Sequence, residues 1–117
     1  MSRSIEEAAR IALACMDLTS LGETDTPLMV ADLVARSRSP FGAPAALCVW
    51  PRFVRQVAVG LDALHGAGQG ASASDASVPQ VAAVVNFPSG TEPLAQVLSQ
   101  VRGILASGGA EVDLVLD

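Results

Sequence analysis

The sequence alternates between helical and strand-like segments, and the spacing of this alternation restricts the possible folds more than any other feature. The predicted strands begin near residues 13, 45, 81 and 111, and helical patterns separate them. Separations of about thirty residues are what strand–helix–strand units with parallel strands require. The predicted order is helix, strand, helix, strand, helix, strand, helix, strand, in the α/β class with a parallel sheet.

Capping signals and apolar runs support the individual segments. Ser4 followed by Glu7 has the capping-box spacing and predicts a helix over 5–11. Thr26-Pro27 predicts the start of a second helix. The runs 45–50 and 81–86 are apolar throughout, which is typical of strands buried on both faces.

The second half of the chain shows the same alternation. After Pro51, apolar residues recur with helical spacing up to Leu64. Thr91 is predicted to cap a further helix, which Gly108 and Gly109 would end. The expected apolar face of that helix comprises Leu94, Val97, Leu98, Val101 and Leu105.

Two closures of such a sheet are possible, an open doubly wound sheet and a (β/α)8 barrel. Four strand–helix units make half a barrel, and the apolar strand 111–117 ends the sequence without a covering element. A barrel therefore implies that further residues lie downstream. The 117 residues make one domain at most, and in a barrel residues 1–117 would supply the N-terminal half of a single domain. The Gly-, Ala- and Ser-rich segment 66–77 is expected to be a flexible loop.

Composition excludes several classes of function. The net charge is -5 and the seven basic residues are scattered arginines, so neither nucleic acid nor an anionic membrane is an expected partner. No apolar segment approaches the roughly 18 residues that span a bilayer. Two separated cysteines predict a reducing cytoplasm rather than a disulfide scaffold, and with one histidine they make no zinc site. The sequence contains no lysine, which excludes a Schiff base on any of its own residues.

Functional side chains in α/β folds lie at the carboxyl ends of the strands. This rule selects Asp17 and Thr19, then Cys48 with Trp50, Asn86, and Asp113 with Asp117. A carboxylate inside a buried strand is costly, so Asp113 is either a general acid or base in a barrel or a solvent-facing residue of an edge strand. Asp17 either acts in a site or caps the next turn. Cys48 is best interpreted as a small buried apolar residue, because the only histidine, His65, lies away from the strand ends.

The segment Ser89-Gly90-Thr91 supports an alternative function. Backbone N–H groups at a helix start can hold a phosphate, so the chain could be a small non-catalytic α/β module that binds an anion there. No glycine-rich nucleotide-binding motif accompanies this segment.

Four motifs resemble those of deoxyribose-phosphate aldolases in order and approximate spacing. They are Met16-Asp17-Leu18-Thr19-Ser20-Leu21, Leu47-Cys48-Val49-Trp50-Pro51-Arg52-Phe53, Val85-Asn86-Phe87-Pro88-Ser89-Gly90 and Gly109-Ala110-Glu111-Val112-Asp113. The resemblance covers nearly the whole chain but only the N-terminal half of the family's length. It implies a (β/α)8 barrel and a class I aldolase that cleaves 2-deoxy-D-ribose 5-phosphate to acetaldehyde and D-glyceraldehyde 3-phosphate through a lysine Schiff base, without a metal or other cofactor.

The resemblance also implies roles for individual residues. Asp113 matches the aspartate that transfers protons with the lysines, Asp17 and Thr19 match residues that line the substrate pocket, and Cys48 matches a cysteine near the site that is not the nucleophile. The family's two active-site lysines lie in its C-terminal half. We therefore expect a phosphosugar substrate, a C-terminal half of the barrel as partner, a homodimer, and no activity of the 117-residue chain alone.

Overall fold

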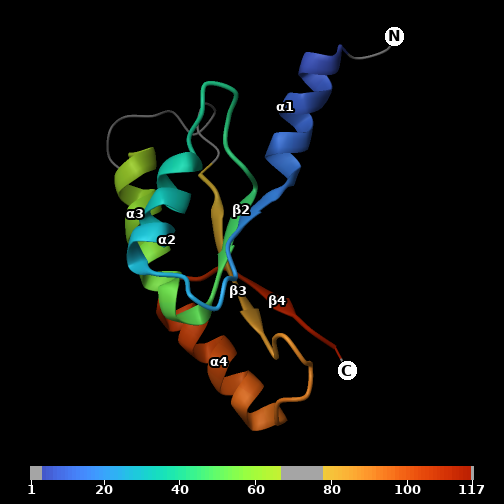
Figure 1. The fold of residues 1–117 in the computed structure, drawn as a ribbon, viewed down its shortest axis with the longest axis vertical. Helices are drawn as coiled ribbons and strands as arrows, with labels where there is room; N and C mark the ends of the chain where they lie inside the picture. Colours follow the sequence, from blue (N-terminus) through green and yellow to red (C-terminus); the bar gives the residue numbers. More distant parts are fainter. Residues whose placement is uncertain (1–3, 67–77, 117) are drawn as a thin grey trace.

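Helices and strands alternate along the chain as the sequence predicts. The computed structural model describes residues 4–66 and 78–116 (Figure 1). The predicted loop 66–77, except for Gly66, and the predicted strand-end residue Asp117 lie outside the described residues. The elements, in chain order, are α1 (Ile5–Cys15), β1 (Asp17–Thr19), α2 (Pro27–Arg36), β2 (Ala46–Val49), the 3-10 turn η1 (Pro51–Phe53), α3 (Val54–His65), β3 (Gln80–Val85), α4 (Leu94–Ala106) and β4 (Glu111–Leu114).

Side chains and turn geometry close the helix ends as their types predict. The Ser4 hydroxyl accepts a hydrogen bond from the Glu7 amide at the start of α1, and Thr26 does the same for Met29 at the start of α2. At the end of α4, Gly108 has a φ of +104°. Its amide and that of the next residue donate to carbonyls of the last turn, a Schellman ending that a left-handed glycine permits.

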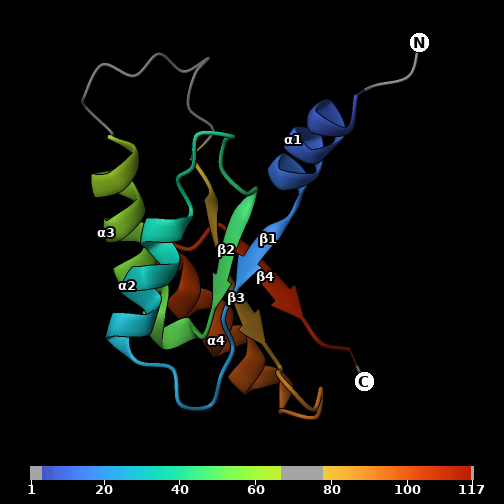
Figure 2. The ribbon, with the colours of Figure 1, turned by 45° about the horizontal axis from the view of Figure 1, so that its top comes forward.

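The four described strands are parallel and lie in the order β1-β2-β3-β4. A doubly wound sheet reverses direction at a switch point and carries helices on both faces, whereas a barrel adds each strand beside the preceding one. Figures 1 and 2 show α2, α3 and α4 together on one side of the sheet, while α1 projects away from it. The barrel prediction is therefore confirmed and the doubly wound alternative is wrong.

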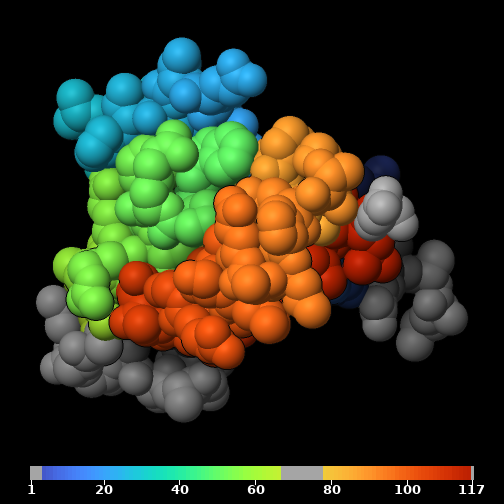
Figure 3. Space-filling model, turned by 90° about the horizontal axis from the view of Figure 1, so that it is seen from below, coloured from blue at the N-terminus to red at the C-terminus, as the bar shows by residue number. Residues whose placement is uncertain are grey.

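The helix-covered side of the sheet holds the main core. Leu47 and Val49 of β2 and Val85 of β3 are almost fully buried there against α2, α3 and α4. In the space-filling view from below, α4 (orange to red) packs directly against the start of α3 (green) (Figure 3). The opposite side of the sheet carries the small buried side chains Ala46, Cys48, Ala82 and Val84.

The boundaries of the first helix and first strand differ from prediction. The helix continues to Cys15, so the strand predicted to begin near residue 13 begins only at Asp17. The apolar residues 11–15 also have helical spacing. A helix whose first turn is capped by Ser4 continues readily through the alanines among them. None of the α1 side chains is buried within the described chain.

Three predictions for the C-terminal third are also wrong. The fourth helix begins at Leu94 after Pro93, so Thr91 does not cap it, and the Thr91 hydroxyl instead pairs with Ser89. The buried face of α4 is formed by Val97 and Ile104, while Leu94, Leu98 and Leu105 are exposed. The strand β4, expected to be buried, is exposed along its whole length because it is an outer strand of the described sheet.

Candidate functional site

The strand register brings the predicted site residues to one face of the sheet. Leu18 packs against the helix-side core, so its neighbours Asp17 and Thr19 project to the opposite side, because side chains alternate along a strand. Thr19 pairs in register with Cys48, whose side chain belongs to the cluster on that same side. Asp113 reaches Cys48 from β4. We call this surface the inner face, since it corresponds to the inside of a barrel.

The closest polar contact on the inner face joins Cys48 to Asp113. The Cys48 Sγ atom lies 3.3 Å from Asp113 Oδ2, although 65 positions separate the two residues in the sequence. Burial, the hydrogen bond to Asp113 and nearby negative charges, in that order of importance, raise the pKa of the Cys48 thiol to about 12. Cys48 therefore stays protonated at neutral pH and donates a hydrogen bond to the carboxylate, as a residue that is not a nucleophile.

Three carboxylates act on this thiol. The charges of Asp113, Asp17 and Glu111 all raise the pKa of Cys48, and the register places Glu111 level with Cys48, with Ala82 between them. The two ion pairs among the described residues lie elsewhere, on α1 and α2, so no arginine neutralises these carboxylates within the described chain. Sequence analysis missed Glu111, although its alternation with Asp113 along one strand indicates a shared face.

Asp17 and Asp113 differ in detail from their predicted settings. Asp17 is the first residue of β1 rather than its tip, and it lies level with Ala46, two positions before Cys48. The turn after β1 is closed by Asp25, which accepts from the Ser20 hydroxyl, so Asp17 is not the turn-capping residue. Asp113 is exposed on an outer strand, as one of its two interpretations expects, yet it also faces the site.

An aromatic rim closes the carboxyl end of the inner face. Trp50 and Phe87 contact edge to face, with ring centroids 5.3 Å apart, and Leu21 joins them over the small residues of the sheet. The Trp50 indole N–H donates to the Gly22 carbonyl at 2.9 Å, which anchors the rim to the loop after β1. Each of these three residues follows a strand closely. That position selected Trp50 from the sequence, and it is the signal by which Leu21 and Phe87 could have been predicted.

Asn86, another predicted strand-tip residue, turns away from the inner face. Its side-chain amide donates to the Val115 carbonyl and its Oδ1 accepts from the Glu92 amide, both at 2.8 Å. The backbone of Asn86 is in the left-handed region, with a φ of 55°. Asn86 therefore ties the end of β3 to the chain after β4 and to the approach of α4.

The remaining polar candidates, Glu92 before α4 and His65 at the end of α3, form hydrogen bonds within the chain. The Glu92 carboxylate accepts from the side chains of Gln96 and Gln100 just before α4, so a negative charge already occupies the helix start where the alternative function would place an anion. His65 contacts the buried Ser37 hydroxyl at 3.1 Å, and burial, followed by the charge of Arg38, lowers its pKa.

The raised pKa of Cys48 predicts a selective thiol labelling pattern. At pH 8 iodoacetamide is expected to alkylate the exposed Cys15 at least tenfold faster than the buried Cys48, because the thiolate is the reactive form. Between pH 8 and 10 the Cys48 rate should rise about tenfold per pH unit, since this range lies below its pKa. Peptide mass spectrometry measures both rates, and urea-unfolded protein is the control. Equal rates in the folded chain would contradict the assignment.

The fold and the inner face together define a class. A parallel sheet with sequential strands, helices on one side and polar side chains on the other is the arrangement found in (β/α)8-barrel enzymes. The described chain forms four successive strands of such a barrel. Within the described residues, no helix has the length and apolarity needed to cross a membrane.

Comparisons with known proteins agree with this class and indicate a family. The chain is 38% identical over 110 residues to the deoxyribose-phosphate aldolase of Agrobacterium fabrum, covering 94% of this chain and 38% of that relative. No family model matches the sequence. The resemblance to deoxyribose-phosphate aldolases is thus confirmed over nearly the whole chain, which spans about two fifths of the relative's length.

Solved structures show the same fold. The tetrameric deoxyribose phosphate aldolase of Aeropyrum pernix matches with a TM-score of 0.71 and 23% identity, over 92% of this chain and 39% of that one. A provisionally assigned deoxyribose-phosphate aldolase from Toxoplasma gondii matches with a TM-score of 0.75 and 24% identity, over 96% and 38%. Both comparisons place the four described strands within a barrel.

Proposed function

We propose that this chain supplies one wall of a deoxyribose-phosphate aldolase active site. The reaction is the reversible cleavage of 2-deoxy-D-ribose 5-phosphate to acetaldehyde and D-glyceraldehyde 3-phosphate. The observation that carries the proposal is the convergence of Asp17, Thr19, Cys48 and Asp113 on the inner face. The similarity to the Agrobacterium fabrum aldolase supports the choice of reaction.

The reaction requires an amine that this chain does not have. In a class I aldolase a neutral lysine amine attacks the substrate carbonyl and forms a Schiff base, which accepts the electron pair of the breaking carbon–carbon bond. The sequence contains no lysine. The proposal therefore includes a C-terminal half of the barrel, corresponding to the remaining length of the relatives, that carries the lysine and closes the barrel opposite the inner face.

Asp113 has the properties of a proton-transfer group in such a site. Its carboxylate is exposed on the open side of the sheet, and one oxygen is held by the Cys48 thiol at 3.3 Å. A carboxylate fixed in this way can take a proton from the reacting amine or hydroxyl and return it later in the cycle. The protonated thiol orients Asp113 and does not compete with the amine for the carbonyl.

Asp17 and Thr19 would line the substrate pocket. Both are exposed on the inner face, at successive levels of β1, and can offer oxygen atoms to the hydroxyl groups of a phosphosugar. The proposal invokes no metal or other cofactor. It further treats the chain as the N-terminal half of the barrel domain of a cytoplasmic enzyme that works as an oligomer.

Co-expression with a lysine-bearing partner tests the proposal. The chain is produced alone, and also together with the part of the Agrobacterium fabrum aldolase that lies beyond its region of similarity. Acetaldehyde and borohydride should leave the chain alone unmodified and inactive. In the co-purified complex they should trap a reduced adduct on the partner, and cleavage of the deoxyribose phosphate should appear. A covalent adduct on this chain, or a complex that forms but shows no aldolase activity, would refute the proposal.

A further inference from the structure

The outer side of the α2–α3 pair carries an apolar surface. Val59 of α3 is 62% exposed there. Beside it a groove of about 470 Å³ runs between the two helices, walled by Ala31 and Val34 of α2 and by Val59 and Gly60 of α3. A Cβ atom on Gly60 would lie 3.1 Å from Val34, so the two helices touch at the floor of the groove. We call Val59 and this groove the α3 outer surface.

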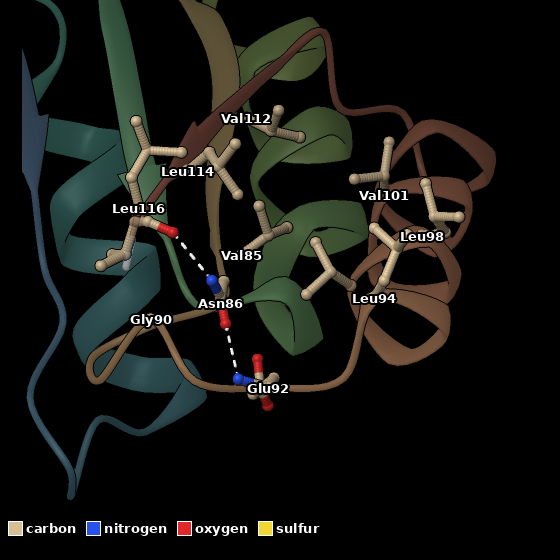
Figure 4. Close-up of a pocket in the computed structure, with 12 residues that line it drawn as sticks. Val85, Asn86, Gly90, Glu92, Leu94, Leu98, Val101, Val112, Leu114 and Leu116 are labelled. Atoms are coloured by element: carbon tan, nitrogen blue, oxygen red, sulfur yellow. Dashed lines mark hydrogen bonds between the residues drawn. The ribbon is translucent and has the colours of Figure 1, made fainter.

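The α3 outer surface differs from the apolar surfaces at the open edges of the sheet. The groove between α4 and β4 lies at such an edge (Figure 4). In a barrel, the next strand and helix adjoin an edge of this kind. The α3 helix already has a neighbour on each side, because it meets α2 at Gly60 and Val34 and the end of α4 at Ala58 and Gly108. The outer ring of the barrel therefore has no further helix that covers the α3 outer surface.

Two opposite charges flank Val59 on the same side of α3. Arg55, Val59 and Asp62 are exposed, and their spacings of four and three residues place them on one helix face. The Arg55 guanidinium donates a long hydrogen bond, 3.5 Å, to the Ala106 carbonyl. The two ion pairs among the described residues lie on α1 and α2, so neither charge is paired within this part of the chain. Arg55 and Asp62 are about 10 Å apart along the helix axis, with Val59 near the midpoint.

We propose that the α3 outer surface binds a second copy of this chain across a two-fold axis that passes near Val59. Antiparallel packing of two α3 helices about this axis brings Val59 against its counterpart in the other copy. It also brings each Arg55 opposite Asp62 of the other copy, because the two charges lie on either side of Val59 at similar distances. The interface therefore contains two ion pairs related by symmetry. This inference rests on the oligomer in the proposed function, but not on its chemistry.

The order of charges and the side-chain sizes favour a second copy as the occupant. Parallel packing would bring Arg55 against Arg55 and Asp62 against Asp62, so electrostatics select the antiparallel arrangement. Gly60 and the exposed Ala63 are small, which allows two helices to approach closely around Val59. A second copy supplies the complementary pattern by symmetry alone, whereas a different protein would have to match both the charges and their spacing.

Charge reversal tests the two-fold pairing. The sample is the complex with the remaining part of the Agrobacterium fabrum aldolase, which covers the edges of the sheet, or the 117-residue chain alone if that complex does not form. Analytical ultracentrifugation gives the dimer Kd. Arg55→Asp and Asp62→Arg each place like charges opposite one another at both pairs, so each should raise this Kd at least tenfold.

Glu7→Arg is the matched control for these variants. It makes the same carboxylate-to-arginine change as Asp62→Arg, but on α1, which projects away from the sheet and from α3 (Figures 1 and 2). It should change the dimer Kd less than twofold. Circular dichroism confirms folding, and Arg55→Gln, with an expected rise in Kd of about threefold, replaces Arg55→Asp if that variant unfolds.

Mixing the two reversed variants gives the most specific result. A mixed dimer of Arg55→Asp with Asp62→Arg has opposite charges at both pairs, so it should form within about threefold of the original Kd although neither variant dimerises well alone. The double variant should recover in the same way. A local distortion of α3 by either substitution would not be repaired by mixing.

The outcomes separate this inference from the proposed function. Dimers that follow the charge exchange but have no aldolase activity would support the two-fold pairing and refute the proposed function. An active complex that is monomeric would support the aldolase chemistry and refute the pairing. A monomeric unmodified sample, folded variants that fail to dimerise when mixed, or an equal effect of Glu7→Arg would each overturn the pairing.

Discussion

Replacing Asp113 by asparagine in the reconstituted complex is expected to lower kcat by about 100- to 10,000-fold. An amide has nearly the shape of the carboxylate but cannot take up a proton, so the substitution removes proton transfer and leaves packing intact. The Asp113 side chain is exposed and makes one described hydrogen bond, to Cys48, so the fold should tolerate the change. KM should change much less than kcat.

Glu111 provides the matched control for this experiment. It lies two positions earlier on the same strand and the same inner face, and its charge also acts on Cys48. Glu111→Gln makes the same carboxylate-to-amide change and should leave kcat within about threefold, since Glu111 makes no described contact with the thiol. Steady-state kinetics with the deoxyribose phosphate measure both variants. Equal losses would show that the total negative charge of the face matters, and not a proton-transfer role of Asp113.

Replacing Asn86 by alanine is expected to destabilise the chain by about 3 kcal/mol. Two side-chain hydrogen bonds would be lost, to the Val115 carbonyl and from the Glu92 amide, each contributing about 1 kcal/mol. In addition, alanine in the left-handed region costs roughly 1–2 kcal/mol, a conformation that asparagine tolerates better. Urea unfolding followed by circular dichroism measures the change in free energy of unfolding.

Asn86→Gly separates the two contributions. Glycine adopts a positive φ without strain, so this variant should lose only the hydrogen bonds, about 2 kcal/mol. The alanine variant should therefore be the less stable of the two by about 1 kcal/mol. If both variants unfold at the same urea concentration, backbone strain plays no part at this position.

Most of the fold follows from local patterns in the sequence. The caps at Ser4 and Thr26 and the apolar runs of β2 and β3 predict their elements to within one or two residues at the predicted starts, because each signal lies in contiguous side chains. The boundary near residue 13 was wrong because residues 11–15 satisfy helix and strand patterns equally well. The start of α4 was wrong because Pro93, not Thr91, precedes the first helical turn.

The sequence predicted candidate residues that share one face of the sheet, but it did not predict their contacts. The rule that strand ends carry function selected Asp17, Thr19, Cys48 and Asp113, and the register places all four on the inner face. The same rule also selected Asn86. Its backbone is in the left-handed region, and its side chain holds the Val115 carbonyl instead of facing the inner face. A contact such as that between Cys48 and Asp113, on strands that are not neighbours, depends on the stagger of the whole sheet, which local sequence patterns do not specify.

The outer strand β4 has a consequence for how copies of this chain meet. Unpaired strands invite identical molecules to join edge to edge, the first step toward aggregation. Glu111 and Asp113 alternate along this strand, so two copies paired there would crowd like charges together. These two acids, of which Asp113 also has a role in the proposed chemistry, would then discourage edge-to-edge association of identical chains.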